Sequence, residues 1–417
     1  MTTTDLIESF SHSIVPTYAR FPLAFVRGKG SRLWDMEGRE YLDFGTGIAV
    51  CSIGHAHPAL AEAIARQAQT LIHTSNFYHT EPQAALAGKL VSLLGPGKCF
   101  FANSGAEANE ALYKLARKFG HDSGRHEILT TLNSFHGRTL AGIAATGQDK
   151  VKKGFEPAVE GFRHVSFNDL NAVQQAVTDQ TAAILIEGVQ GESGIHPASP
   201  DYLRGLRKLC DDRRLLLFVD SVQCGMFRTG RFQSYQRILE VNSASPVPSS
   251  EFLPDAVSMA KGIAGGVPMG AVWIRQPYAD LLGPGTHGST FGGTPLACTA
   301  ALAVFDVIER EKLADNARHL GDYLKSQITS LRSPHIREVR GLGLMIGVEL
   351  QSNIPSLSVE GKTPASLLVL RLHEHGLLTI PAGNQTIRLL PPLNITRAEA
   401  DEAVQKVCNA LQNESGH

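Results

Sequence analysis

The sequence predicts an α/β protein with a mostly parallel main sheet flanked by helices, together with a smaller α+β region. Three observations indicate this class. The 417 residues include 40 glycines and are 43% hydrophobic, an ordinary composition for a globular protein. Short, continuously apolar runs alternate with helical patterns, as expected of parallel strands buried on both faces. The length also exceeds what one hydrophobic core usually serves, so we expect more than one domain.

The central part of the chain carries the strands expected in the main sheet. Apolar runs of strand length occupy residues 98–103, 126–132, 182–189, 214–220, 255–260 and 270–275. Helical periodicity marks residues 104–120 and 200–213. In the first of these helices, Ser104 and Glu107 match the S-x-x-E pattern of a capping box.

The two ends of the chain have a different character. From about Pro295 a long helical stretch runs to about Leu331, and EVRGLGLMIGVEL after it is expected as a strand or a hairpin. A helix over residues 364–375 follows, then QTIRLLPPL and a closing helix capped by Thr396–Glu399. Residues 27–47 alternate as a small antiparallel sheet does. We therefore expect a large domain over residues 51–299 and a small α+β domain over residues 300–417, to which residues 1–50 contribute.

Composition and charge exclude several classes of function. The formal net charge of −1 gives no electrostatic reason to expect nucleic acid or an anionic membrane as a partner. The start of the chain lacks a basic region followed by an apolar core, and no apolar run approaches the ~20 residues that span a bilayer. The six cysteines are scattered without a C-x-x-C pair, so we expect reduced thiols, no metal site and a cytoplasmic protein.

Three segments that follow predicted strands can carry chemistry. Ser104, Gly105 and Ala106 open a helix, where free backbone N–H groups and small side chains admit a phosphate. Lys261 directly follows an apolar strand, and desolvation favours the neutral amine that attacks carbonyl groups. Asp220 ends another apolar strand, where a carboxylate requires a partner such as a protonated pyridine nitrogen.

Each of these features alone has an ordinary explanation, as a capped helix, a solvated lysine or a surface carboxylate. Pyridoxal phosphate requires all three from its protein: a lysine, an acid for the ring nitrogen and an anion site for the phosphate. All three lie at the carboxyl ends of predicted strands, where open α/β sheets bind ligands. The combination therefore predicts a pyridoxal 5'-phosphate site.

Motifs along nearly the whole chain resemble one family. The segments are LWDMEGREYLDFGTGIAV, GHAHPAL, TSNFYHTEPQ, FFANSGAEANEAL, SFHGRT, EGVQGESG, FVDSVQCGMFRTG, MAKGIAGGVPMGA, HGSTFGGTPLA and RGLGLMIGVEL. In this order they are similar to the class III aminotransferases of pyridoxal-phosphate fold type I, with a large domain built on a seven-stranded-type sheet. Within the class, the chain most resembles the branch that transfers the terminal amino group of N-acetylornithine to 2-oxoglutarate in arginine biosynthesis.

The resemblance implies roles for residues around the cofactor. Lys261 binds the cofactor covalently and then moves the proton of the reaction, and Asp220 pairs with the ring nitrogen. Ser104, Gly105 and Ala106 bind the phosphate. The remaining cofactor contacts implied are Phe135 and Val222 on the two ring faces, Gln223 near the ring hydroxyl, and Thr290 on the phosphate of the neighbouring subunit. The protein is thus expected to be a homodimer with shared active sites.

The resemblance also implies a substrate site. Arg138 grips the α-carboxylate, a task that suits its planar guanidinium, and Ser289 lies in the same site. Glu192 and Arg388 form a gate, in which the arginine binds the second carboxylate of 2-oxoglutarate or glutamate. The glutamate neutralises that arginine when the acylated diamino acid enters instead. His136 is less expected as a general base, because Lys261 already fills that role.

The sequence departs from the family pattern at three places. Ser221 stands where the family has glutamate, Phe227 stands where it has glycine, and residues 241–254 form a longer, Ser/Pro-rich insertion. We expect the lost glutamate to remove a charge close to the cofactor and to change specificity or rate modestly. Alternative donors within the class are 4-aminobutyrate, ornithine, succinylornithine and N-succinyl-diaminopimelate. A non-catalytic relative that kept the fold is the alternative outside enzymes.

Overall fold

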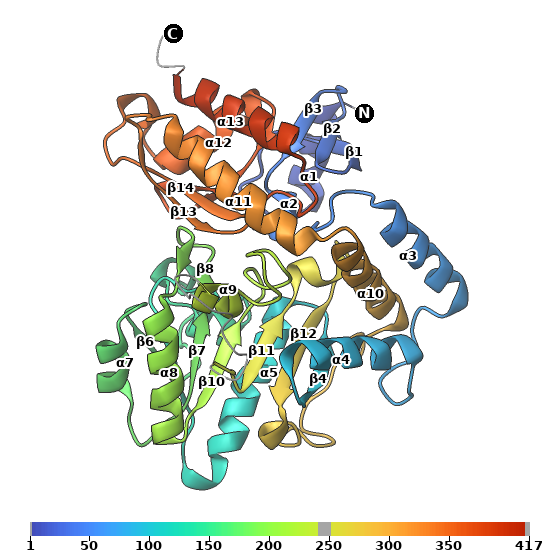
Figure 1. Ribbon diagram of the computed structural model, residues 1–417, viewed down its shortest axis with the longest axis vertical. Coiled ribbons are helices and arrows are strands. Elements are labelled where there is room, and N and C mark those ends of the chain that lie inside the picture. The colour runs from blue at the N-terminus through green and yellow to red at the C-terminus, as the bar shows by residue number, and fades with distance from the viewer. Residues whose placement is uncertain (1, 241–251, 413–417) are drawn as a thin grey trace.

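The computed structural model describes residues 2–240 and 252–412 and confirms the predicted α/β class (Figure 1). A large sheet with helices on both sides occupies one half of the molecule, and the C-terminal elements form the other half together with the first strands of the chain. No helix in the described ranges is long and apolar enough to cross a membrane.

The main sheet has seven strands in the order β4-β12-β11-β10-β7-β5-β6, and only β12 runs antiparallel to its neighbours. The strands are β4 (Gly97–Ala102), β5 (Glu127–Thr131), β6 (Phe162–Val165), β7 (Thr181–Glu187), β10 (Leu216–Asp220), β11 (Ala256–Met259) and β12 (Gly270–Arg275). All six strand predictions in this region are confirmed. Strand β6 was missed because it is a short edge strand that contains Arg163 and His164.

The two faces of the sheet are covered by different helices. Along β10, Leu216 and Phe218 belong to one core with helix α5 (Gly105–Gly120). Leu217 and Val219 belong to the other core with helix α8 (Pro200–Arg213). Because side chains alternate across a strand, Asp220 at the end of β10 points to the α5 side and Ser221 to the opposite side.

Two smaller sheets involve the ends of the chain. Strands β13 (Ile336–Leu342), β14 (Met345–Leu350), β17 (Thr386–Leu389) and β16 (Ile380–Ala382) form one antiparallel sheet. The other sheet joins β1 (Phe25–Lys29), β2 (Arg32–Asp35) and β3 (Glu40–Asp43) to β15 (Leu377–Leu378). The antiparallel arrangement predicted within residues 27–47 is therefore confirmed, and it pairs with a strand from the C-terminal region.

Further helices and one short strand pair complete the fold. They are α1 (Thr3–Ser13), α2 (Thr46–Ala49), α3 (Pro58–Thr70), α4 (Glu81–Leu94), α6 (Leu140–Ala145), α7 (Leu170–Ala176), α9 (Ser234–Glu240), α12 (Pro364–Glu374) and α13 (Arg397–Gln412), with β8 (Val189–Gln190) and β9 (His196–Pro197).

The helical stretch expected from Pro295 to about Leu331 is confirmed, but the chain divides it into two helices. Helix α10 (Pro295–Arg310) and helix α11 (Leu313–Ser330) are separated at Lys312, whose φ of 54° is left-handed. A left-handed residue cannot continue a right-handed helix. The predicted domain boundary at residues 299 and 300 falls inside α10, which packs on α3 and α4 as well as on α11. The division into domains therefore stays a prediction.

The two predicted capping boxes have different outcomes. Thr396 and Glu399 exchange both hydrogen bonds of a capping box. At α5, Ser104 Oγ accepts from the N–H of Glu107, but the Glu107 carboxylate accepts from the N–H of Asn103 instead of Ser104. The prediction at α5 is therefore half right. Of the expected insertion at residues 241–254, residues 241–251 lie outside the described residues.

Candidate active site

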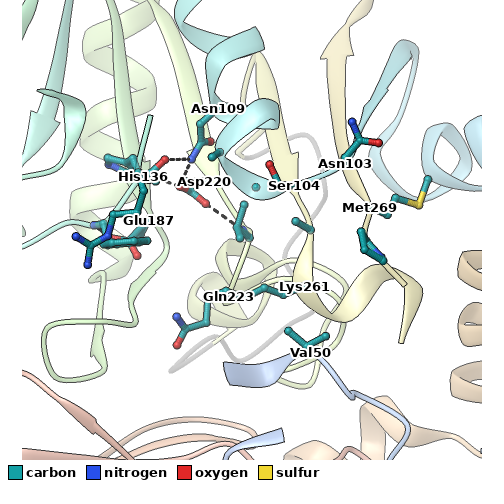
Figure 2. Close-up of a pocket in the computed structure, with 18 of the residues that line it drawn as sticks. Val50, Asn103, Ser104, Asn109, His136, Glu187, Asp220, Gln223, Lys261 and Met269 are labelled. Atoms are coloured by element: carbon teal, nitrogen blue, oxygen red, sulfur yellow. Dashed lines mark hydrogen bonds and ion pairs between the residues drawn. The ribbon is translucent and has the colours of Figure 1, made fainter. Parts of the chain in front are cut away.

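A cavity of about 380 Å³ lies between the carboxyl ends of the parallel strands and the segment that carries Val50 (Figure 2). Most of the residues at its wall lie at the ends of β4, β5, β7, β10 and β11 or directly after them, and others come from the segment before β12. Eight residues predicted to bind the cofactor line it: Ser104, Gly105, Ala106, Phe135, Asp220, Val222, Gln223 and Lys261. The fold therefore brings together residues that are separated by more than a hundred positions in the sequence.

Asp220 is held by donors from three different elements. Its Oδ2 accepts from Asn109 Nδ2 at 2.7 Å and lies 2.8 Å from His136 Nδ1, and its Oδ1 accepts from the N–H of Val222 at 3.0 Å. Figure 2 shows these contacts converging on the carboxylate. With a side chain only 4% exposed, Asp220 is kept as a fixed, desolvated acceptor facing the cavity.

Two of these partners were not singled out as site residues from the sequence. Asn109 lies on α5, where its Nδ2 also donates to the carbonyl of His136 and its Oδ1 accepts from Ser258. His136, considered only as a base, instead holds Asp220, while its Nε2 is buried without a hydrogen-bond partner among the described residues. Their positions follow from the packing of α5 on the sheet, which no local sequence pattern reveals.

Lys261 follows β11 and has a left-handed backbone with φ 46°. Burial, together with the nearby Arg388 guanidinium, lowers the pKa of its amine to about 8, although the charge of Asp220 opposes the shift. Desolvation penalises the charged ammonium form. A substantial fraction of the amine is therefore neutral at physiological pH, as a lysine that attacks an aldehyde requires.

The start of α5 approaches β10 closely. A Cβ on Gly105 would lie 2.7 Å from Cγ1 of Val222, so a larger residue would displace the side chain that forms one wall of the cavity. Ser104 and Ala106 flank this glycine at the helix N-terminus, where the backbone N–H groups and the helix dipole favour an anion.

Glu187 is a cavity residue that was not singled out from the sequence. It ends β7 and pairs in register with Asp220 on β10, so two carboxylates stand side by side. Its oxygens accept from the N–H groups of Phe135 at 3.1 Å and Gly191 at 3.4 Å. Burial raises the pKa of Glu187 to about 7, with a contribution from Asp220 that His136 opposes. A charge at the end of an apolar strand, the signal that identified Asp220, was present here too.

Of the predicted substrate residues, only Arg138 lines the cavity. Its guanidinium carbon lies 5.4 Å from the centre of the Phe135 ring. Arg388 on β17 donates to Gln223 Oε1 at 3.2 Å, which ties it to the cavity wall. Glu192 acts electrostatically on Arg388, but among the described residues its ion pair is with Lys150 at 3.7 Å. The gate between Glu192 and Arg388 thus stays a prediction.

Thr290 and Ser289 do not line the cavity. Ser289 Oγ accepts from Asn103 Nδ2 at 3.1 Å, and Asn103 does line it, so Ser289 lies one residue behind the wall. Thr290 is exposed and borders a different surface depression together with Asn76. The structure therefore does not bring Thr290 to the phosphate position of its own chain.

Two of the three departures from the family pattern are not residues that line the cavity. Ser221 is fully buried, and its side chain leaves β10 on the face opposite Asp220. The expected effect of losing the glutamate on specificity or rate stays a prediction. Phe227 adopts a left-handed φ of 63° and packs on Phe232 and Phe305, with ring centres 5.3 and 6.3 Å away.

The cavity fits pyridoxal phosphate on three structural grounds. The first ground is the amine of Lys261, whose pKa is lowered. The second is the carboxylate of Asp220, whose Oδ1 accepts only one hydrogen bond from the described residues, that of a backbone N–H group. The third is the helix start, which Gly105 keeps open. These features correspond to the aldehyde, the ring nitrogen and the phosphate of the cofactor.

Sequence comparisons show that the chain is similar to aminotransferases along nearly its whole length. The family model described as aminotransferase class-III matches residues 14–411. An acetylornithine aminotransferase from Nostoc sp. is 44% identical over 416 residues, covering 97% of this chain and 93% of that protein.

Solved structures of aminotransferases also resemble this chain over nearly its whole length. An acetylornithine aminotransferase from Elizabethkingia anophelis superimposes with a TM-score of 0.84 at 31% identity, covering 99% of both chains. An ornithine aminotransferase from Toxoplasma gondii, with partial occupancy of PLP at its active site, superimposes with a TM-score of 0.89 at 31% identity, covering 98% of this chain and 94% of that one.

The pKa of Lys261 leads to a prediction about cofactor attachment. Because only the neutral amine attacks an aldehyde, the rate at which apoprotein binds pyridoxal phosphate covalently should rise with pH and level off above about pH 8. Stopped-flow absorbance over a pH series measures this rate. A Lys261→Ala apoprotein should show no covalent attachment, and a wild-type rate that falls as pH rises would contradict the assignment.

The support of Asp220 leads to a second prediction. Asn109→Ala removes a 2.7 Å hydrogen bond to the carboxylate, so it should weaken cofactor affinity about tenfold, the usual effect of losing a hydrogen bond to a charged group. Ser258→Ala is the matched control, because it removes a bond to Asn109 and leaves both Asp220 oxygens with their donors. Equilibrium titration of apoprotein with cofactor compares the two variants. Equal losses of affinity would mean that Asn109 acts only through packing.

Proposed function

The chain belongs to the class-III aminotransferase family, a family of pyridoxal-phosphate-dependent enzymes, and from this premise we propose that it transfers the terminal amino group of N-acetylornithine to 2-oxoglutarate. The products are N-acetylglutamate semialdehyde and glutamate, so the reaction is a step of arginine biosynthesis. The observation that carries the proposal is the convergence of Lys261, Asp220 and the Ser104–Ala106 helix start on one cavity. The Nostoc and Elizabethkingia relatives support the choice of amino donor.

When bound, pyridoxal phosphate supplies an electron-accepting ring that carries the amino group between the two halves of the reaction. Asp220 holds the proton on the ring nitrogen, and Asn109 and His136 keep the carboxylate in place. Lys261 binds the cofactor between turnovers and moves the proton that leaves the substrate carbon. Phe135 and Val222 line the same cavity and would contact the two faces of the ring, excluding water from it.

Two arginines are the proposed anchors for substrate carboxylates. Arg138 at the cavity wall binds the α-carboxylate, and Arg388 binds the second carboxylate of 2-oxoglutarate or glutamate. Glu192 neutralises Arg388 when the acylated diamino acid enters. Ser289, which lies behind Asn103, is a lesser contact in this proposal.

We further propose a homodimer in which the partner's Thr290 completes the phosphate site. Thr290 is exposed and does not line the cavity of its own chain, which supports this arrangement. The exposed aromatic residues Phe77 and Phe291 lie in the same segments as the depression beside Thr290, and large exposed apolar groups are typical of interfaces.

The six free cysteines agree with a cytoplasmic location.

A screen of amino donors with 2-oxoglutarate as acceptor tests the substrate. N-acetylornithine should give the highest kcat/KM, at least about tenfold above ornithine, 4-aminobutyrate and succinylornithine, because its acyl group replaces a charged amine near the arginines. Glutamate formation measures the rate. If another donor gives a higher kcat/KM, that donor takes the place of N-acetylornithine in the proposal. If no donor gives activity, the proposal is refuted.

Mixed dimers test the shared site. Lys261→Ala removes the catalytic amine, and Thr290→Glu places a negative charge against the partner's phosphate, so each homodimer should be inactive. After subunit exchange, a mixed dimer has one intact site, and random 1:1 mixing should restore about a quarter of the wild-type activity. If mixing restores nothing although exchange is demonstrated by mass, Thr290 does not act across the interface.

A further inference from the structure

Glu192 lies within electrostatic reach of two cations. It follows β8, and its Oε1 is 3.7 Å from Nζ of Lys150, in the segment after α6. Its Oε2 is buried and has no hydrogen-bond partner among the described residues. Glu192 also interacts electrostatically with Arg388. Burial lowers the pKa of that guanidinium, and the negative charge of Glu192 is the main influence that raises it again. One carboxylate is therefore available to two cations.

Arg388 lacks an ionised partner in the described part of the chain. It is only 5% exposed, and its Nη atoms donate to the carbonyls of Gly191 and Pro381 and to the amide oxygen of Gln223. All three acceptors are neutral, and Nε is buried without a partner. Burial lowers the pKa of Arg388 to about 10. A buried cation without an anion is costly, so the position attracts a carboxylate, either that of Glu192 or that of a substrate.

We propose that Lys150 is a positioning residue that sets substrate preference: by pairing with Glu192, it keeps Arg388 open for the second carboxylate of a dicarboxylate substrate. This inference rests on the proposed function and concerns the same site. Lys150 is not a cavity-lining residue, so it acts through Glu192.

The weakness of the ion pair suits this role. The side chains of Lys150 and Glu192 are 60% and 27% exposed, and ion pairs with such access to solvent bias an equilibrium by about two- to fivefold. A strong pair would lock Glu192 in one place. A weak pair lets Glu192 turn to Arg388 when the other substrate needs a neutral site, and lets it return when a dicarboxylate binds.

The test compares Lys150→Met with wild-type holoenzyme. Without Lys150, Glu192 should spend more time on Arg388, so the KM for 2-oxoglutarate should rise about two- to fivefold at low salt. The Kd of glutarate, a dicarboxylate that cannot react, should rise by the same factor in a binding titration. The KM for the amino donor and the kcat should stay unchanged while the KM for 2-oxoglutarate and the Kd of glutarate rise. Lys150→Arg should restore wild-type values, and high salt should shrink the difference.

Two further variants separate this effect from general charge or packing effects. Lys153→Met removes the same charge from an exposed lysine in the same segment and should leave both KM values unchanged. In a Glu192→Gln background, Lys150→Met should have no effect, because there is no carboxylate left to hold. An equal rise in both KM values, or the same effect in the Glu192→Gln background, overturns the inference.

The glutarate titration also distinguishes this inference from the proposed function. If wild-type enzyme uses 2-oxoglutarate but glutarate binding is the same with and without Lys150, only the role of Lys150 fails. If glutarate binding responds as expected but N-acetylornithine is not a donor, the proposed donor fails and the role of Lys150 stands.

Discussion

The carboxylate of Asp220 is the constraint on which the site depends. It stands at the end of a strand buried on both faces, where an ionised group persists only if donors surround it. The side chains of Asn109 and His136 and the N–H of Val222 supply those donors from three elements. Because α5 provides Asn109 and also begins at Ser104, the helix that holds the acid is the same helix whose N-terminus forms the anion site. One rigid element therefore fixes the spacing between the support of Asp220 and the anion site at the helix start.

The cavity and its surroundings bring two acidic side chains, Asp220 and Glu187, close to two basic ones, Lys261 and Arg388. Asp220 and Glu187 stand in register on neighbouring strands, and both interact electrostatically with Lys261. Burial raises the pKa of Glu187 and lowers the pKa values of Lys261 and Arg388, because it favours the neutral form of each of these three groups.

The relation between Lys150, Glu192 and Arg388 extends these electrostatic interactions to substrate choice. An enzyme that takes two chemically different substrates in turn needs a cation that is available to one and hidden from the other. A carboxylate shared between a buried arginine and an exposed lysine provides two states of similar free energy. The exposed position of Lys150 keeps the difference small enough for the substrates themselves to decide between the states.

The sequence by itself determined the fold class, six of the seven strands in the main sheet and the three groups that converge on the cavity. It could do so because these signals are local: apolar runs, a helix start at Ser104, and charged residues directly after strands at Asp220 and Lys261. It did not determine the break at Lys312, the short polar edge strand β6, or the contacts of Asn109 and His136. Only the tertiary structure decided these, because they depend on which surfaces pack together. The alternation of side chains along β10 turned Ser221 away from the cavity, and the packing of α5 on the sheet turned Asn109 towards it.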